Sequence, residues 1–221
     1  MSYRDRLQQR LDETGRPLRV GLVGAGQMGR GFAAQLLRMP GISLSAVLDV
    51  QRERAVDALG QAGITPSEAT DAESAARAIE AGESVALERV EDLVGLPLDI
   101  VVEATGVPEV AVNVAVQALS AGIGVATLTV EADVTVGRYM AHLASESGAI
   151  YSICRGDEPV ETKILVDYAR DLNFEVICAG KGKNNPLDPY ATPESLAERA
   201  TEKQMNPKML ASFVDGSKAM I

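Results

Sequence analysis

The sequence has few of the residues on which metal clusters and redox centres depend. Its 221 residues include one histidine, His142, two cysteines, Cys154 and Cys178, and no tryptophan. A zinc cluster needs several His or Cys ligands, so a site of that kind is excluded. Both cysteines end apolar runs, YSIC and FEVIC. This setting predicts buried, reduced thiols and disfavours a redox pair.

Positive charge and long apolar runs are also scarce. The chain has 21 Lys and Arg against 31 Asp and Glu, a formal net charge of -10. A general nucleic-acid-binding protein needs a basic surface, and this composition excludes one. No apolar run approaches the roughly 20 residues that cross a bilayer, and the charged start MSYRDRLQQRLDE lacks a signal-peptide core. We therefore expect a cytoplasmic protein with no membrane partner.

The chain does contain a regular alternation of short β-rich runs with longer helical stretches. This alternation predicts an α/β fold, a doubly wound Rossmann-type parallel sheet covered by helices. The expected strands are 18–23, 42–48, 99–102, 124–128, 149–154 and 174–179. The expected helices are 4–13, 27–38, 52–61, 71–81, 108–120, 134–147, 159–171, 193–203 and 207–221. The stretch 65–98 is interpreted as an insertion, with one extra short strand within 84–97.

Two domains are expected. Residues 1–155 would form an NAD(P)-binding Rossmann domain, and residues 156–221 the N-terminal part of an α+β catalytic or substrate domain. The last expected helix reaches Ile221 without a cap or stop signal, so we interpret the chain as the front part of a longer protein.

The strongest motif is a glycine-rich turn between the first strand and the next helix. Gly24 would allow the tight turn, Gly26 would let the backbone approach a pyrophosphate, and Gly29 would let helix and strand pack closely. The helix N-terminus would add free N–H groups for the phosphates. The match to G-x-G-x-x-G is Gly24-Ala25-Gly26-Gln27-Met28-Gly29, so Gln27 and Met28 are also expected at the cofactor.

An acidic residue follows where such a motif needs one. Asp49 ends the second strand, the place from which a carboxylate binds the adenosine ribose. Its charge favours NAD, whereas Arg52 and Arg54 just beyond would suit the extra phosphate of NADP. The choice between the two cofactors stays open. A methyltransferase that binds S-adenosylmethionine is disfavoured by the spacing of the third glycine and by the later strands.

The turn after the strand DIVV is a second expected contact. In a doubly wound sheet, ligands lie beyond the carboxyl ends of the strands. Glu103, Ala104, Thr105 and Gly106 follow that strand directly. We therefore expect them to lie against the cofactor.

Several stretches of the sequence together resemble a known family. LRVGLVGAGQMG, DIVVEATG and GVATLTVEADVTVG are similar to the nucleotide-binding domain of the homoserine dehydrogenase family, and residues 151–186 look like the start of its substrate domain. VEADVTVG, GKGKNNP and YATPESL are similar to a branch that carries a SAF domain and includes 1-deoxy-D-xylulose 5-phosphate reductoisomerase-like proteins. The resemblance implies an oxidoreductase with NAD or NADP, with Glu131 near the cofactor.

Two departures from that family bear on the substrate. This chain has TVE at 129–131 in place of an Asn-Lys pair, and GKNN at 182–185 in place of an Asn-Gly-Thr-Thr-Asn run. Both changes disfavour homoserine itself. Lys181 and Lys183 would suit an anionic substrate such as a phosphorylated sugar, although loop lysines are commonly only solvated.

Hydride transfer to a carbonyl needs a proton donor and positive charge near the oxygen. The resembled family uses an Asp and a Lys from the region of Asp215 and Lys218, which would share a helix face here. An exposed ion pair is the competing interpretation. His142 points away from the apolar face of its expected helix and is a poor candidate. The expected catalytic residues are Lys218, Asp215, Lys183, Lys181 and Asn184.

No metal site is assigned. Glu131 and Asp133, with Asp157 or Glu158, would offer oxygen ligands to Mg²⁺ or Mn²⁺. Carboxylates near helix N-termini are more commonly partners of the helix dipole.

The sequence thus predicts an NAD(P)-dependent dehydrogenase or reductase. It would move hydride between nicotinamide and the carbonyl or alcohol of a small polar, anionic metabolite, although this piece alone need not be active. Two alternatives stay open: a reductoisomerase that needs a divalent metal, and a non-catalytic dinucleotide sensor. The expected partners are the small-molecule substrate and further copies of the chain in a homo-oligomer.

Overall fold

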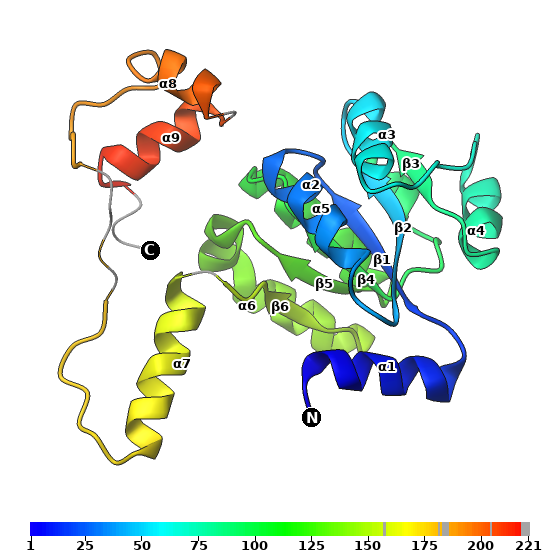
Figure 1. Ribbon diagram of the computed structural model, residues 1–221, viewed down its shortest axis with the longest axis horizontal. Helices are drawn as coiled ribbons and strands as arrows, with labels where there is room; N and C mark the ends of the chain where they lie inside the picture. Colours follow the sequence, from blue (N-terminus) through cyan, green and yellow to red (C-terminus); the bar gives the residue numbers. More distant parts are fainter. Residues whose placement is uncertain (157, 181, 183–185, 204, 218–221) are drawn as a thin grey trace. The chain divides into compact units, whose positions relative to one another are not determined.

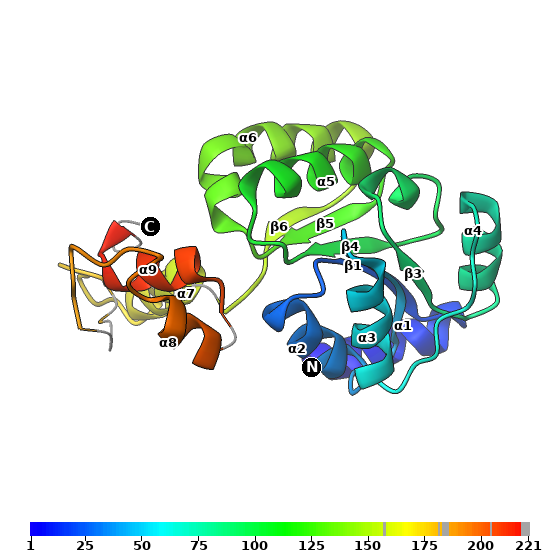
Figure 2. The same cartoon turned by 90° about the horizontal axis from the view of Figure 1, so that it is seen from above.

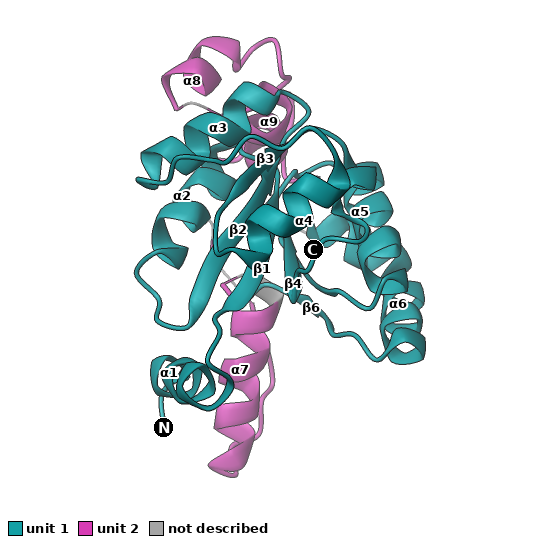
Figure 3. Ribbon diagram, turned by 90° about the vertical axis from the view of Figure 1, so that its right-hand side faces the viewer, with its two compact units in different colours: residues 1–154 teal, residues 155–221 magenta. Residues whose placement is uncertain are grey.

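The computed structural model describes residues 1–156, 158–180, 182, 186–203 and 205–217. The chain divides into two compact units, Met1–Cys154 and Arg155–Ile221 (Figures 1 and 3). Among the described helices, none is long and apolar enough to cross a membrane.

Unit 1 is built on one parallel sheet of six strands. The strands are β1 (Leu18–Val23), β2 (Ile42–Leu48), β3 (Val85–Leu87), β4 (Ile100–Glu103), β5 (Gly124–Thr127) and β6 (Tyr151–Ile153). Their order is β3-β2-β1-β4-β5-β6, and every neighbouring pair is parallel. The order reverses between β1 and β4, which is the switch point of a doubly wound Rossmann fold. The predicted fold class is confirmed.

Helices cover both faces of this sheet and close two hydrophobic cores (Figure 2). On one face, Leu59 of α3 is buried in the same cluster as Leu22 of β1. On the other face, Leu119 of α5 and Met140 of α6 are buried with Val101 of β4. The helices of unit 1 are α1 (Tyr3–Thr14), α2 (Gln27–Leu36), α3 (Arg52–Gln61), α4 (Ala72–Glu80), the 3-10 helix η1 (Val90–Leu93), α5 (Pro108–Ser120) and α6 (Val130–Ser147).

Local signals in the sequence explain where several helices begin. At α1, the Ser2 hydroxyl accepts the Asp5 N–H at 3.2 Å, and the Asp5 carboxylate accepts the Ser2 N–H at 2.9 Å. Asp71 and Ser74 form the same reciprocal cap at α4. Pro108 occupies the first turn of α5, where its missing N–H costs no hydrogen bond.

Two expectations for unit 1 are wrong in detail. The stretch 65–98 is not an insertion, because its β3 pairs with β2 as the third strand of the sheet, with Val85 opposite Ala46. Helix α6 begins at Val130 and not at 134, so Glu131 and Asp133 lie in its first turn. The additional first turn contains Glu131 and Asp133, whose negative charges are favourable at a helix N-terminus, and it buries Ala132.

In the described part of unit 2, the regular secondary structure is helical. Its helices are α7 (Glu158–Asp171), α8 (Ala197–Glu202) and α9 (Pro207–Val214). Ala200, Leu210 and Val214 form its small core. The expected strand 174–179 is absent, because a strand needs a partner and the described part of this unit supplies none. Ile177 in this segment is 94% exposed.

Helix α9 is shorter than the sequence predicts. It ends at Val214, with Asp215 as its C-cap, and Gly216 follows at φ +87°. The expectation that Asp215 shares a helix face with Lys218 is therefore wrong for Asp215, which lies past the helix end. Lys218 is outside the described residues.

Candidate functional site

The three motif glycines differ in what surrounds them. A Cβ on Gly24 would lie 2.8 Å from the backbone of Ala104, and one on Gly29 would lie 1.9 Å from the Gly24 carbonyl oxygen. Gly24 also has φ +97°. A Cβ on Gly26 would meet nothing within 4 Å. Two glycines therefore close the turn, and the third leaves open space beside the backbone, which a pyrophosphate could occupy.

Helix α2 begins at this open position. Gly26 is its N-cap, and no side chain caps the first turn. The first N–H groups of a helix have no partner within the helix, and its dipole places positive charge there. Met28, in that turn, is 64% exposed. The start of α2 is therefore suited to an anionic phosphate group.

Asp49 joins the glycine turn to the end of β2. One carboxylate oxygen accepts the Ala25 N–H at 2.9 Å, and the other accepts the Gln51 N–H at 3.0 Å. The residue is 8% exposed. Each oxygen keeps a further lone pair for a ligand hydroxyl. This geometry fits the acidic residue that binds the adenosine ribose in dinucleotide-binding proteins.

Arg52 lies in the first turn of α3. Its guanidinium is 3.7 Å from the Glu68 carboxylate, in a pair whose side chains are 37% and 91% exposed. An exposed pair of this kind contributes little to stability. Arg52, which the sequence suggested for the extra phosphate of NADP, therefore has a carboxylate neighbour in this structure.

The ends of β4 and β5 contain the buried carboxylate of Glu103, which the sequence placed in the expected cofactor turn without a role of its own. The Glu103 carboxylate accepts the Thr105 N–H at 2.7 Å and the Thr105 hydroxyl at 2.5 Å. It also accepts the hydroxyls of Thr127 at 2.7 Å and Thr129 at 3.0 Å. Glu103 is fully buried, and Thr127 and Thr129 are nearly so. The signal for this network in the sequence was a charged residue at the end of an apolar strand. Its partners Thr127 and Thr129 are distant in sequence.

This network holds the turn Ala104–Gly106, which was expected at the cofactor. The Thr129 hydroxyl accepts the Gly106 N–H at 3.1 Å, and the Thr105 hydroxyl accepts the Val107 N–H at 3.2 Å. The turn is packed against the glycine loop, since Ala104 borders Gly24. The two expected cofactor-contacting segments therefore lie side by side.

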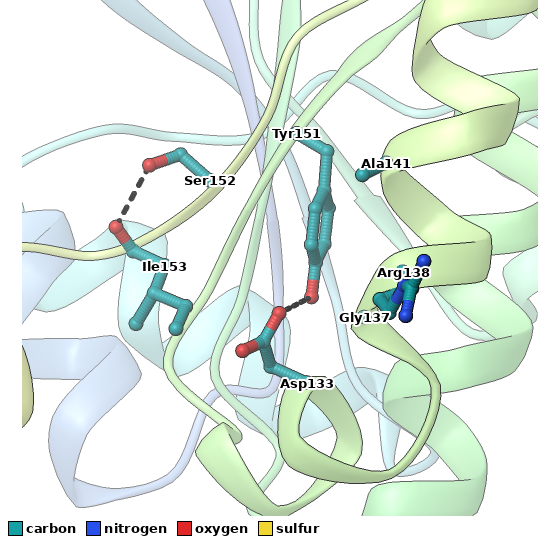
Figure 4. A pocket seen from close by; sticks show the side chains of 7 residues that line it. All are labelled: Asp133, Gly137, Arg138, Ala141, Tyr151, Ser152 and Ile153. Atoms are coloured by element: carbon teal, nitrogen blue, oxygen red, sulfur yellow. Dashed lines mark hydrogen bonds between the residues drawn. The ribbon is translucent and has the colours of Figure 1, made fainter.

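A shallow cavity of about 370 Å³ lies between α6 and the edge strand β6 (Figure 4). Within it the Tyr151 hydroxyl donates to Asp133 at 2.9 Å. Burial, followed by the Asp133 carboxylate, raises the pKa of Tyr151 above its usual range. A Cβ on Gly137 would lie 2.3 Å from an Asp133 carboxylate oxygen, so this position of the carboxylate requires glycine at residue 137.

Asp133, one of the carboxylates considered for a metal from the sequence, therefore has a tyrosine partner in this structure. Glu131, in the same turn of α6, also has an interaction partner. Asp157 and the side chain of Glu158 lie outside the described part of the chain. Among the described residues, no three His, Cys, Asp or Glu side chains gather in a way that could hold a metal.

Most of the expected catalytic residues fall outside what the structure describes: Lys181, Lys183, Asn184 and Lys218. Their roles stay predictions. The Asp215 carboxylate accepts the Ser217 N–H at 2.8 Å. The side chain of His142 is 62% exposed and lies 3.4 Å from Glu146, as the sequence led us to expect for a surface residue.

The two cysteines differ from each other. Cys154 is partly buried, and burial raises the pKa of its thiol to about 11, with the Glu103 charge as a second cause. Cys178 is exposed, so the expectation of burial is wrong for it. That expectation depended on a strand at 174–179, which does not form.

Two family models match the sequence. "Homoserine dehydrogenase, NAD binding domain" matches residues 24–153, and "Oxidoreductase DRL, catalytic domain" matches residues 156–221. The first match spans more than half of the chain and contains the glycine turn, Asp49 and Glu103. A search of curated proteins gives no match.

Solved oxidoreductases share the fold of this chain. WlbA dehydrogenase from Bordetella pertussis, in complex with NADH and UDP-GlcNAcA, is 20% identical with a TM-score of 0.50, over 72% of this chain and 43% of that one. The Chromobacterium violaceum WlbA is 17% identical with a TM-score of 0.54, over 72% and 41%. An oxidoreductase from Agrobacterium radiobacter, in complex with NAD+, L-tartaric acid and magnesium, is 13% identical with a TM-score of 0.51, over 69% and 40%.

The chain spans about two fifths of the length of these solved relatives. At these identities the likeness concerns the fold. The family assignment depends on the NAD-binding model, whose matched residues carry the turn and carboxylates described above. This chain belongs to the homoserine dehydrogenase NAD-binding domain family.

Proposed function

We propose that the protein transfers hydride between nicotinamide and the carbonyl or alcohol of a small polar metabolite. The observation that carries this proposal is the open, uncapped glycine turn beside Asp49, at the switch point of the sheet. The match of residues 156–221 to an oxidoreductase catalytic domain supports an enzyme over a dinucleotide sensor.

The residues of the site divide the binding of the dinucleotide among them. The N–H groups at the start of α2 would bind the pyrophosphate, and Asp49 would accept hydrogen bonds from the adenosine ribose. The turn Ala104–Gly106 would border the second half of the cofactor. The nicotinamide ring supplies or accepts the hydride when the dinucleotide is bound.

We further propose that NAD is preferred to NADP. Asp49 accepts two backbone N–H bonds at the end of β2, and its carboxylate would repel a 2′-phosphate. Arg52, the nearest cation expected to attract that phosphate, has Glu68 as a neighbour. The geometry therefore favours a free ribose hydroxyl at this position.

The proposed substrate class is a small anion, for which Lys181 and Lys183 are the supporting residues in the sequence. The test follows the absorbance of NADH while the full-length protein is supplied with anionic carbonyl compounds, including sugar phosphates. Substrate-dependent oxidation without added metal supports the proposal. A strict need for Mg²⁺ or Mn²⁺, with a rearranged carbon skeleton in the product, would replace it with the reductoisomerase alternative. Tight NADH binding without any oxidation would favour the sensor.

A homo-oligomer stays a prediction from the sequence. Light scattering on the purified protein would test it by giving the molar mass in solution.

A further inference from the structure

We propose that Glu103 is a positioning residue for the nicotinamide half of the cofactor. It would act by fixing the two strand ends that border this half, without touching the cofactor itself. The inference rests on the proposed function, since it presupposes that a dinucleotide binds across the switch point of the sheet.

The hydrogen bonds around Glu103 have a defined direction. The hydroxyls of Thr105, Thr127 and Thr129 accept the backbone N–H groups of Val107, Thr129 and Gly106, respectively. A hydroxyl that accepts such a bond still has its own proton to donate, and in each case the Glu103 carboxylate lies within 3.0 Å. The Thr105 N–H donates to the same carboxylate directly. The Glu103 carboxylate therefore accepts one hydrogen bond from a backbone N–H and three from threonine hydroxyls.

The role of the Glu103 carboxylate follows from its position in the sheet. Glu103 ends β4, and Thr127 ends the neighbouring strand β5. The helices that follow, α5 and α6, begin just beyond these strands, at Pro108 and Val130. In a doubly wound sheet each half binds one mononucleotide. Asp49 lies on the half formed by β1, β2 and β3, and Glu103 on the other half, beyond the switch point.

Replacement of Glu103 by glutamine would reverse the direction of part of these hydrogen bonds. The glutamine amide keeps one accepting oxygen and places an NH2 donor where the other carboxylate oxygen accepts, so a threonine hydroxyl that faces the NH2 must turn its own proton away, which disturbs its hydrogen bond to the backbone N–H. The backbone segments that would lose hydrogen bonds are Thr105–Gly106 and the start of α6, whereas the glycine turn and Asp49 keep theirs. The expected effect is therefore confined to the nicotinamide half.

The test compares the affinities of the chain for NADH and for ADP-ribose, which lacks the nicotinamide ring. For Glu103→Gln we expect the dissociation constant of NADH to rise about fivefold to tenfold, and that of ADP-ribose to stay within about twofold. The matched control is Asp99→Asn at the other end of β4. It removes another carboxylate from the same strand region, and it should lower the melting temperature without changing the ratio of the two constants.

Several results would overturn the proposal. An equal loss of both affinities in Glu103→Gln would indicate a purely structural role, and so would no change in either. If that variant does not fold, Thr129→Val serves instead, because it removes one hydrogen-bond donor and keeps the carboxylate. It should change the ratio of the NADH and ADP-ribose dissociation constants in the same direction by a smaller factor. An unchanged ratio contradicts the proposal. A failure of the proposed function is distinguishable from these results, because the unmodified chain would then bind neither NADH nor ADP-ribose.

Discussion

At the scale of single residues, the site depends on the free space around each glycine of the turn. Gly29 has no room, because a methyl group there would overlap the Gly24 carbonyl oxygen. We expect Gly29→Ala to lower the free energy of unfolding by about 3 kcal/mol, as overpacking against rigid backbone does. Urea denaturation would measure it.

The matched control for that variant is Gly31→Ala, in the same helix. A Cβ at Gly31 meets nothing within 4 Å. Alanine is the better helix former, so we expect this change to raise the free energy of unfolding by about 0.5–1 kcal/mol. Equal effects of the two substitutions would contradict the described packing of the turn.

Asp49 is expected to set the choice between the two dinucleotides. We expect Asp49→Ala to weaken NADH binding by about tenfold and NADPH binding by less, because the substitution removes both a ribose partner and a charge that repels the 2′-phosphate. Isothermal titration calorimetry with both ligands would measure the change in preference. Glu53→Ala removes an exposed charge from the first turn of α3 and should leave the preference unchanged. An unaltered ratio in Asp49→Ala would refute this role.

At the scale of elements, an ion pair ties the start of β4 to the chain before β1. The Asp99 carboxylate receives two hydrogen bonds from the Arg16 guanidinium, at 2.7 and 2.8 Å, and one from the Arg19 N–H at 2.8 Å. The hydrogen bond from Arg16 is the main cause that lowers the pKa of Asp99. A lowered pKa in the folded state means that this stabilisation is present above the pKa of the unfolded chain and is lost as the pH falls through the folded-state value.

We therefore expect Asp99→Asn to cost about 1 kcal/mol at neutral pH, a modest value because the Arg16 side chain is 46% exposed. The cost should shrink as the pH falls below the folded-state pKa of Asp99, since the native carboxyl is then uncharged too. Urea denaturation of both proteins along a pH series would measure it. A cost that does not depend on pH would show that the charge has no role.

The elements of unit 1 were largely predictable because their signals are local. The runs at β1 and β2 and the helix α5 agree in extent with the sequence prediction, since apolar spacing and Pro108 mark them. The strand expected at 174–179 was wrong because pairing depends on distant partners. The same limit applies to the site: the glycine turn and Asp49 form a local motif, whereas Glu103 finds Thr127 and Thr129 only when two strands pair.

At the scale of the whole molecule, both hydrophobic cores of the sheet and every described cofactor-site residue lie in residues 1–154. We therefore expect a chain of residues 1–154 to unfold cooperatively and to bind NADH within about twofold of the affinity of the 221-residue chain. Thermal unfolding and calorimetric titration would measure both properties. A large loss of affinity would show that unit 2 contributes to cofactor binding.

The central claim is that a dinucleotide binds at the open position of the glycine turn, and Gly26→Ala tests it most directly. Gly26 has extended backbone and free space around its Cα, so alanine should leave the melting temperature unchanged. Calorimetric titration with NADH should give saturable binding to the unmodified chain and at least about a tenfold weaker interaction with the variant, since the methyl group occupies the place of the pyrophosphate. Equal affinity in two equally stable proteins would contradict the account.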